Sequence, residues 1–234
     1  MLINETTAKE IKDFYIKKAD YLLSVVQLYT SEPPFTQDYK FAIAGGCMAA
    51  GKVNDIDIFP IGDNPVIPFL RERVVSETRN AVTLSGHRYP IQLCHYRHPT
   101  LADLVESFDF SHIQIGVACT LRESGVLTAD EVYYSNGFVK ANMLGSTEYT
   151  HSKYPLSSLI RMNKYMERGN LSPHRHVSTT IAILKDIVKR GYTSYNDFKD
   201  QLDAVDLGLL PEDFKDLDRE DLKELFELLR KDIH

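Results

Sequence analysis

The sequence predicts an α+β protein in which a small mixed β-sheet domain is followed by an all-α domain. Two observations lead to this prediction. Short apolar, β-branched runs alternate with short amphipathic segments up to about Gly145, and turn residues separate them. Beyond Gly145 the apolar residues recur only at helical spacing, with capping signals at the segment ends. We therefore expect two domains, residues 1–145 and residues 146–234.

In the first domain, residues 6–29 have helical periodicity, and the SEPPF stretch at 31–35 ends that helix. YKFAIAGG is typical of a buried strand that runs into a glycine turn, and VNDIDIFPI of a second strand. A helix is expected over 66–79, and AVTLSG with YPIQLCHY predicts a hairpin. TLADLVESF predicts a short helix, and FDFSHIQIGVAC predicts a further strand.

In the second domain, YPLSSLIRMNKYMERG predicts a helix that ends at Gly169. SPHRHVSTTIAILKDIVKRG predicts another, with Ser172 as N-cap, Pro173 at the first helical position and Gly191 at the end. REDLKELFELLRKDI predicts a helix near the C-terminus. The two histidines of HRH at 174–176 are two residues apart and share no helical face, so this triplet favours a first helical turn over a metal site.

Composition narrows the functional classes. The chain has 234 residues and a net charge of -6, so contact with nucleic acid would need a local basic patch. Its cysteines are three in number and widely spaced, which argues against a disulfide framework and for a reducing compartment. No apolar run suits a signal peptide or a membrane span. We expect a cytoplasmic protein with no membrane partner.

One stretch, AIAGGCMAAGKVNDIDIF at 42–59, admits two interpretations. Gly46 to Lys52 satisfies most of the P-loop pattern that cradles nucleotide phosphates. However, Val53 stands where a P-loop has the Ser or Thr that ligates magnesium. A P-loop also leads directly into a long helix, whereas VNDIDIFPI is typical of a strand. The context therefore excludes a P-loop.

The alternative is a pair of carboxylates at a strand. Side chains two apart on a strand share a face, so Asp55 and Asp57 are expected to point the same way while the isoleucines beside them face a core. Two carboxylates about 7 Å apart can share a pair of Mg²⁺ ions. Gly45 and Gly46 would let a triphosphate approach the backbone, with amide donors from the short helix behind them. Lys52 could reach a phosphate, or lie in solvent.

A Gly-Gly turn followed by Asp-x-Asp resembles the signature of the DNA-polymerase-β-type nucleotidyltransferase superfamily. The chain looks closest to the class II branch of CCA-adding enzymes and bacterial poly(A) polymerases. YPIQLCHYR, NGFVKAN and PLSSLIRMNKYMERG are similar to that branch's Tyr-Arg strand, the element before its neck and its neck helix. The resemblance covers roughly residues 40–170 and implies a palm-like catalytic domain followed by a helical neck. The branch's base-reading motif is missing.

The resemblance also implies a third acid on a neighbouring strand. Gln92 occupies the usual position, and an amide is a poor magnesium ligand, so Asp109 is the candidate. The alternative for Asp109 is a turn cap before the strand. Arg161 and Lys164 belong to a basic stripe on the predicted neck helix, which either grips a triphosphate or acceptor or is a solvated face.

The activity that the resemblance implies is transfer of an NMP from an NTP, ATP or CTP, to an acceptor hydroxyl with two Mg²⁺ ions. Asp55, Asp57 and Asp109 would hold the metal, and the acceptor could be an RNA or tRNA 3′ end. Two alternatives stay open: a toxin-like nucleotidyltransferase that modifies protein or tRNA, and a non-catalytic nucleotide-binding regulator of the same fold. The sequence leaves the oligomeric state undetermined.

Overall fold

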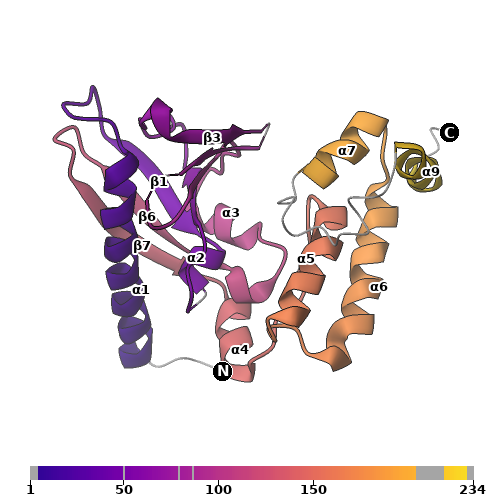
Figure 1. The fold of residues 1–234 in the computed structure, drawn as a ribbon. Helices are drawn as coiled ribbons and strands as arrows, with labels where there is room; N and C mark the ends of the chain where they lie inside the picture. The colour runs from indigo at the N-terminus through magenta and orange to yellow at the C-terminus, as the bar shows by residue number, and fades with distance from the viewer. Residues whose placement is uncertain (1–4, 50, 79, 86, 204–218, 231–234) are drawn as a thin grey trace. The chain divides into compact units, whose positions relative to one another are not determined.

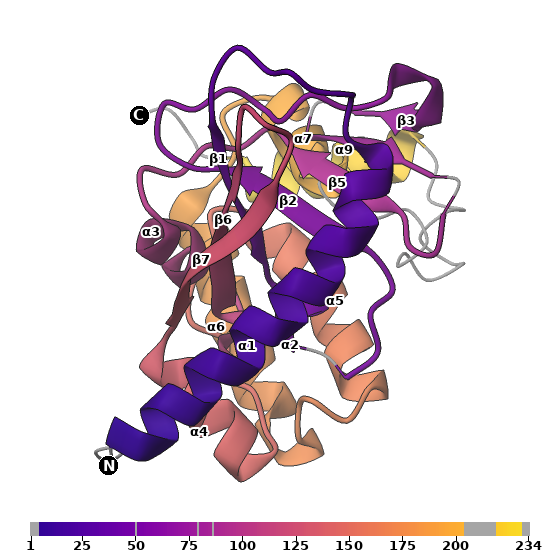
Figure 2. The same ribbon diagram turned by 90° about the vertical axis from the view of Figure 1, so that its left-hand side faces the viewer.

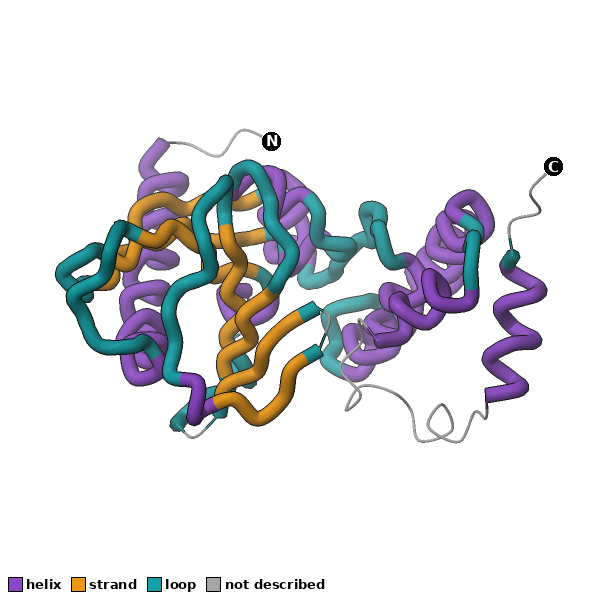
Figure 3. Tube along the Cα trace, turned by 90° about the horizontal axis from the view of Figure 1, so that it is seen from above, coloured by secondary structure: helices purple, strands orange, loops and turns teal. Residues whose placement is uncertain are grey.

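The computed structural model describes residues 5–49, 51–78, 80–85, 87–203 and 219–230. The chain divides into two compact units (Figure 1). The first unit comprises residues 1–108 and 113–139, and the second comprises residues 109–112 and 140–234. All the β-strands of the described residues belong to the first unit, as the tube in Figure 3 shows by colour. The predicted α+β class is confirmed.

The first unit is built on one mixed sheet of seven strands. In spatial order they are β3 (Val74–Glu77), β4 (Ala81–Leu84), β5 (Ile91–Cys94), β2 (Ile56–Pro60), β1 (Tyr39–Ala44), β6 (Ile115–Leu121) and β7 (Leu127–Tyr134). Neighbouring strands are antiparallel except for β2 and β5, which are parallel. The predicted hairpin is confirmed as β4 and β5.

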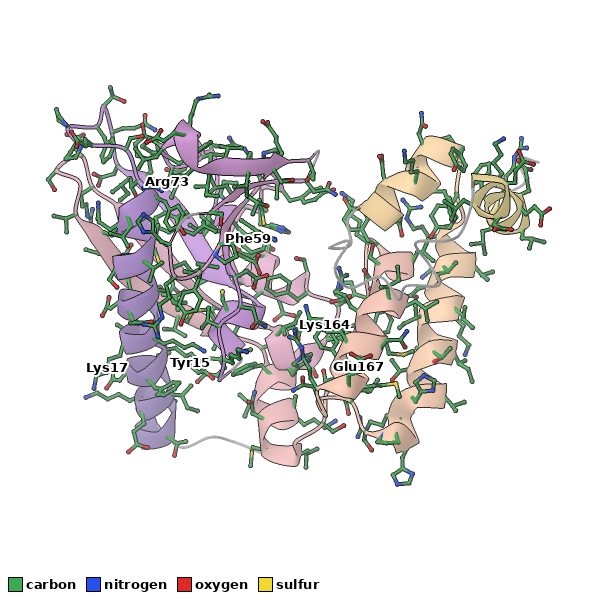
Figure 4. All side chains as sticks on the ribbon, viewed as in Figure 1. Tyr15, Lys17, Phe59, Arg73, Lys164 and Glu167 are labelled. Atoms are coloured by element: carbon green, nitrogen blue, oxygen red, sulfur yellow. The ribbon has the colours of Figure 1, made fainter. Side chains whose placement is uncertain are left out.

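Helix α1 (Glu5–Val26) lies across one face of this sheet (Figure 2) and continues into a 3₁₀ turn, η1 (Gln27–Tyr29). Its apolar stripe, with Ala19 and Leu22 fully buried, packs into the main core. Tyr15 lies edge-on to Phe138, with ring centroids 5.9 Å apart, whereas Lys17 points away from the sheet (Figure 4). Periodicity in the sequence therefore located both the helix and its buried face.

The opposite face of the sheet is covered by α3 (Leu101–Glu106). Thr100 begins this helix: its hydroxyl accepts a hydrogen bond from the backbone N–H of Asp103 at 3.1 Å, a standard N-cap. Gly116 of β6 permits the close approach, because a Cβ there would lie 3.0 Å from the Cβ of Ala44 and 3.1 Å from Leu101. Glycine at position 116 leaves room for the α3 side chains to lie this close to the sheet backbone.

The helix predicted over 66–79 is wrong. The segment instead contains a 3₁₀ turn, η2 (Arg71–Arg73), and the edge strand β3. Pro68 disfavours the helical conformation at the residue before it, and the β-branched pair Val74–Val75 suits a strand. The free edge of β4 then pairs with Val74–Glu77 in antiparallel register. Pairing with the sheet therefore outweighed the weak helical periodicity.

The strand predicted in FDFSHIQIGVAC begins later than expected. Strand β6 starts at Ile115, and Ser111–Ile113 form a 3₁₀ turn, η3. The reason is a competing set of partners in the second unit. The Ser111 N–H donates to the carbonyl of Glu148, and the Thr150 N–H donates to the carbonyl of Asp109, both at 2.9 Å. Asp109 therefore lies in a loop and not on a strand face.

The second unit consists of helices. After α4 (Asn136–Leu144), which spans the division between the units, come α5 (Pro155–Glu167), α6 (Pro173–Arg190), α7 (Tyr195–Asp203) and α9 (Arg219–Leu229). The three helices predicted in this region are thus confirmed over the described residues as α5, α6 and α9, and α5 and α6 lie side by side (Figure 1).

The ends of α6 largely follow the sequence signals. Pro173 is at the first position and Gly191 ends the helix with a φ of 59°, as expected. Ser172 occupies the N-cap position, but its side chain makes no capping hydrogen bond. No helix among the described residues combines the length and apolar character needed to cross a membrane.

Candidate functional site

The candidate site begins at the end of β1, where the chain makes a glycine turn into the four-residue helix α2 (Gly46–Ala49). Gly45 has a φ of 81°, in the left-handed region, and a Cβ there would lie 3.4 Å from the ring of Phe108. Its N–H donates to the carbonyl of Ile115 at 2.9 Å, and its own carbonyl accepts from Met48 and Ala49. The turn therefore needs glycine and is fixed to the sheet.

Helix α2 is held from both sides. The ammonium of Lys18, on α1, donates to the carbonyl of Met48 at 2.6 Å, and the thiol of Cys47 donates to the carbonyl of Ala44 at 3.3 Å. A cation at the C-terminal end of a helix also interacts favourably with its dipole. Partial burial lowers the pKa of Lys18. The hydrogen bond to the Met48 carbonyl is donated by its charged ammonium group. Lys18 thus positions the segment that carries the turn.

Asp57 is the second residue of β2 and lies between two buried isoleucines. Ile56 and Ile58 are 0% and 2% exposed and face the main core, so Asp57 lies on the opposite face, half-buried. Phe59 shares that face and packs edge-on against Phe108, with centroids 5.9 Å apart. The predicted alternation of β2 is confirmed, and it places Asp57 on the sheet face that α3 partly covers.

Asp55 lies immediately before the strand and is also half-buried. Strand β2 begins at Ile56, so Asp55 lies outside the strand and does not share a strand face with Asp57. The direction of the Asp55 side chain is set by the loop over residues 51–55. Asp57 has a polar neighbour on the next strand: its Cα partner in the parallel pairing is Gln92, whose own partner on β4 is Thr83. A polar row therefore crosses the sheet at Asp57.

The charges of Asp55 and Asp57 raise the pKa of two nearby cysteine thiols. Burial raises the pKa of Cys47, and the negative charges of Asp57 and Asp55 raise it further. Burial also raises the pKa of Cys94 well above its usual value, and Asp57 again contributes. Both thiols are therefore protonated at neutral pH, and neither supplies a thiolate ligand or nucleophile. The oxygen donors of the site are the two aspartates.

The surface next to the turn is open. A Cβ at Gly46 or at Gly51 would meet no atom within 4 Å, and Lys52 is exposed in the bend that leads to β2. No group of three or more His, Cys, Asp and Glu side chains is placed to hold a metal ion within the described ranges. The glycine turn, Lys52 and the two aspartates all belong to the first unit.

The remaining predicted residues lie in the second unit. Asp109 is 4% exposed, and its Oδ2 accepts hydrogen bonds from Ser158 at 2.6 Å and from Arg161 Nε and Nη2 at 3.0 and 2.7 Å. These partners account for the buried charge of Asp109 without a metal ion. Asp109 also supports the charged form of Arg161, whose pKa is raised despite desolvation. Lys164 and Glu167 extend from α5 (Figure 4).

Sequence reasoning missed two features that a signal could have revealed. Lys18 falls between Tyr15 and Leu22 at helical spacing, on the buried stripe of α1, where a lysine needs a reason. Ser158 and Arg161 are three residues apart on α5 and share a face, which favours a common partner. That the partner is Asp109 could not be read from spacing, because the two segments lie far apart in the sequence.

A family model described as "Gad2: Gabija anti-defense 2 family protein" matches residues 7–143, more than half of the chain. The chain belongs to this Gad2 family. The matched region holds the sheet and nearly all of α1. It also holds the Gly45–Gly46 turn, Lys52, Asp55 and Asp57, which together form the glycine–aspartate site, and it ends before α5. No curated protein matches the chain significantly.

Among solved structures, one similar chain is described as "tRNA-processing enzyme (apo form 2)". It is 15% identical, with a TM-score of 0.39, and the match covers 82% of this chain and 55% of that one. The Gad2 chain thus spans about half the length of that structure. A likeness at this level bears on no functional assignment.

Proposed function

We propose that this chain transfers a nucleotidyl group from an NTP to an acceptor hydroxyl. The observation that carries the proposal is Asp57, a half-buried carboxylate between two buried isoleucines on a central strand, with Asp55 just before it and the Gly45–Gly46 turn on the adjacent strand. Asp is depleted in strands, so an acid held at this place needs a function. The resemblance of the turn and the Asp-x-Asp pair to nucleotidyltransferases supports the same reaction.

The donor set fits magnesium. Asp55 and Asp57 offer hard carboxylate oxygens, and the neighbouring thiols are kept protonated. Mg²⁺ is commonly bound by one or two carboxylates together with substrate phosphates, so two protein ligands suffice. When bound, a pair of Mg²⁺ ions would supply charge neutralisation on the phosphates and activation of the acceptor hydroxyl.

The residues of the chain would bind and orient the triphosphate. Gly46 leaves open space beside the turn, which lets phosphates approach the backbone. Lys52 is exposed nearby in the chain and would contribute positive charge to the phosphates. Lys18 would keep α2, and with it the turn, in place. We leave Asp109, Arg161 and Lys164 out of the proposed set, because Asp109 and Arg161 satisfy each other and all three belong to the second unit.

Membership of the Gabija anti-defense 2 family supports a role against that defence system, and we place the transfer reaction within this role. The acceptor is an RNA 3′ end, as the resemblance implies, or a protein hydroxyl, as in a toxin-like transferase. The acidic net charge of -6 gives the chain as a whole no general affinity for RNA.

The full chain is incubated with each α-³²P-labelled NTP and Mg²⁺, with total RNA and lysate of Gabija-bearing cells as acceptors. Asp57→Asn keeps the shape of the side chain and should lower transfer on the order of 10³-fold, since it removes a carboxylate that would hold Mg²⁺ at the reacting phosphate. Asp20→Asn, on the exposed side of α1, is the matched control and should not change transfer. Label in RNA or in protein names the acceptor.

A second test asks whether transfer serves the anti-defence role. Expression of the chain should restore phage plating on Gabija-bearing cells, and Asp57→Asn should abolish this while Asp20→Asn retains it. Protection that survives Asp57→Asn would contradict a catalytic role. The absence of labelled product with every NTP and both acceptors would overturn the proposed reaction.

One observation favours a second candidate, a non-catalytic nucleotide-binding protein. Gln92 stands beside Asp57 in the sheet, where the resemblance would place a third acid. An amide there weakens the metal site. This candidate predicts that NTP binds in equilibrium dialysis, that no label is transferred, and that protection of phage survives Asp57→Asn.

A further inference from the structure

A row of polar side chains crosses the sheet of the first unit from Asp57 to the edge strand. The Cα partner of Asp57 is Gln92 on β5. The partner of Gln92 on β4 is Thr83, which in turn pairs with Ser76 on β3. Side chains at paired positions of neighbouring strands share a face, so the four lie on one face of the sheet. Within the first unit α3 packs on β6 and β7, so the row lies beside this helix and not beneath it.

The three neutral members of the row have hydrogen-bonding groups that the protein does not use. Gln92 and Thr83 are half-buried, and Ser76 is exposed. Among the described residues, none is a hydrogen-bond partner of the Gln92 side-chain amide or of the Thr83 and Ser76 hydroxyls. Half-buried polar groups usually have partners. An amide and a hydroxyl without them, in line with Asp57, are placed to hydrogen-bond a ligand.

The order of the strands gives a bound nucleotide its direction. The Gly45–Gly46 turn follows β1, which neighbours β2 on the side away from β5, and α2 packs against β2. With the outer phosphates at this turn and the reacting phosphate at Asp57, the nucleoside extends over β5 and β4. Neighbouring strands are about 4.8 Å apart, so Gln92 lies one strand spacing and Thr83 two spacings from Asp57. The steps from α-phosphate to ribose and from ribose to base are of similar length.

We propose that Gln92 hydrogen-bonds the ribose 2′-hydroxyl of the bound NTP and selects ribonucleotides over deoxyribonucleotides. A side-chain amide carries both donor and acceptor groups and pairs with a hydroxyl in either sense. A deoxyribonucleotide leaves this amide without its partner, and such a loss weakens binding. The inference rests on the proposed nucleotide site and adds its sugar specificity. It also gives a role to the amide at the position where the resemblance would place a third acid.

Equilibrium dialysis of the full chain with each of the four NTPs and its dNTP, with Mg²⁺ and without acceptor, tests the proposal through binding alone. The wild type should bind its NTP about five- to tenfold more tightly than the corresponding dNTP, the effect of one hydrogen bond between neutral groups. Gln92→Leu should weaken NTP binding by the same factor and leave dNTP binding unchanged. The ratio of the two affinities then falls to about one.

The matched control is Cys94→Ala, which changes a half-buried side chain on the same strand and face, two residues from Gln92 and outside the row. It should change neither affinity. Thr83→Val, at the level of the base, should weaken NTP and dNTP binding equally, because the base is common to both. Circular dichroism melting of all variants checks folding. Gln92→Asn, which keeps the amide but shortens its reach, should also lower the ratio and replaces Gln92→Leu if that variant unfolds.

The outcomes separate the sugar assignment from the proposed function. A wild type that binds NTP and dNTP equally, or a ratio that survives Gln92→Leu, would overturn the assignment and leave the nucleotide site in place. A ratio that Thr83→Val lowers as much as Gln92→Leu would contradict the order of ribose and base along the row. A wild type that binds no nucleotide would overturn both the assignment and the proposed function. Ribose-selective binding without labelled product in the transfer assay would overturn the transfer reaction alone.

Discussion

Arg161 donates two hydrogen bonds to a single carboxylate oxygen of Asp109, from Nε at 3.0 Å and from Nη2 at 2.7 Å, across 52 residues of sequence. Ser158 donates a third to the same oxygen, at 2.6 Å. The Asp109 side chain is 5% exposed and that of Arg161 25%. Oδ2 of this buried carboxylate thus accepts three hydrogen bonds from α5, and these contacts fix residues 109–112 to the second unit.

Arg161→Met should destabilise the chain by about 3–5 kcal/mol, because it leaves a buried carboxylate without its cation. Arg168→Met, at an exposed position after α5, should cost less than about 0.5 kcal/mol. Guanidinium unfolding followed by circular dichroism measures both. Asp109→Asn combined with Arg161→Met should recover part of the loss, since no buried charge remains. Equal stability of wild type and Arg161→Met would show that the pair is not a structural anchor.

His112 predicts a pH dependence of stability. Its Nδ1 lies 2.8 Å from the Thr147 hydroxyl, and its ring stacks edge-on against Tyr165 at 4.3 Å. Burial lowers the pKa of His112 from 6.5 to about 4; the charge of Asp109 opposes this shift, and the nearby cations Arg168 and Lys164 add to it. The folded state therefore favours the neutral ring.

Because the unfolded chain binds a proton at His112 below about pH 6.5 and the folded chain does not until about pH 4, stability falls across that window as the pH falls. The contribution of neutral His112 is complete above the window. Denaturant unfolding at several pH values should show a shallower slope for His112→Asn than for wild type. Identical slopes for the two proteins would contradict the assignment.

Gly116→Ala should destabilise the packing of α3 on the sheet. It places a Cβ within 3.0–3.1 Å of side-chain atoms of Ala44, Leu101 and Val105, so these neighbours must give way by a few tenths of an ångström. Overpacking of this kind costs about 1–3 kcal/mol. Gly51→Ala, where a Cβ meets no atom within 4 Å, is the matched control and should leave the unfolding midpoint within experimental error. A Gly116→Ala protein as stable as wild type would mean that α3 does not pack tightly here.

Lys18 and Lys17 are neighbours with different surroundings. Lys18 donates to Met48 of α2 at 2.6 Å, while Lys17 is exposed on the far side of α1. Lys18→Met should cost about 1.5–3 kcal/mol, the range for hydrogen bonds to charged groups, and Lys17→Met almost nothing. Thermal unfolding checks this.

If Lys18 positions α2 for nucleotide binding, its substitution should change NTP affinity as well as stability. NTP affinity of the folded protein should fall in Lys18→Met and recover in Lys18→Arg, which restores a donor to the Met48 carbonyl. Undiminished NTP affinity in folded Lys18→Met would limit Lys18 to a structural contact.

The sequence by itself determined the features that depend on neighbours along the chain. The Ile56–Asp57–Ile58 alternation predicted a strand with its acid turned from the core, and the Gly45–Gly46 pair predicted a glycine turn before it. Helices α1, α5 and α6 followed from apolar periodicity, because a helix buries one face whatever it packs against. The glycine–aspartate part of the candidate site was therefore within reach of local patterns.

Only the tertiary structure decided the features that depend on distant partners. Residues 74–77 became strand β3 because β4 offered a free edge, and β7 pairs with β6 although no strand was predicted over Leu127–Tyr134. Asp109 was predicted on a strand beside the other acids, yet it lies in a loop and bonds to Arg161. Hydrogen-bond partners and burial arise from chain segments brought together by folding, and local spacing carries no record of them.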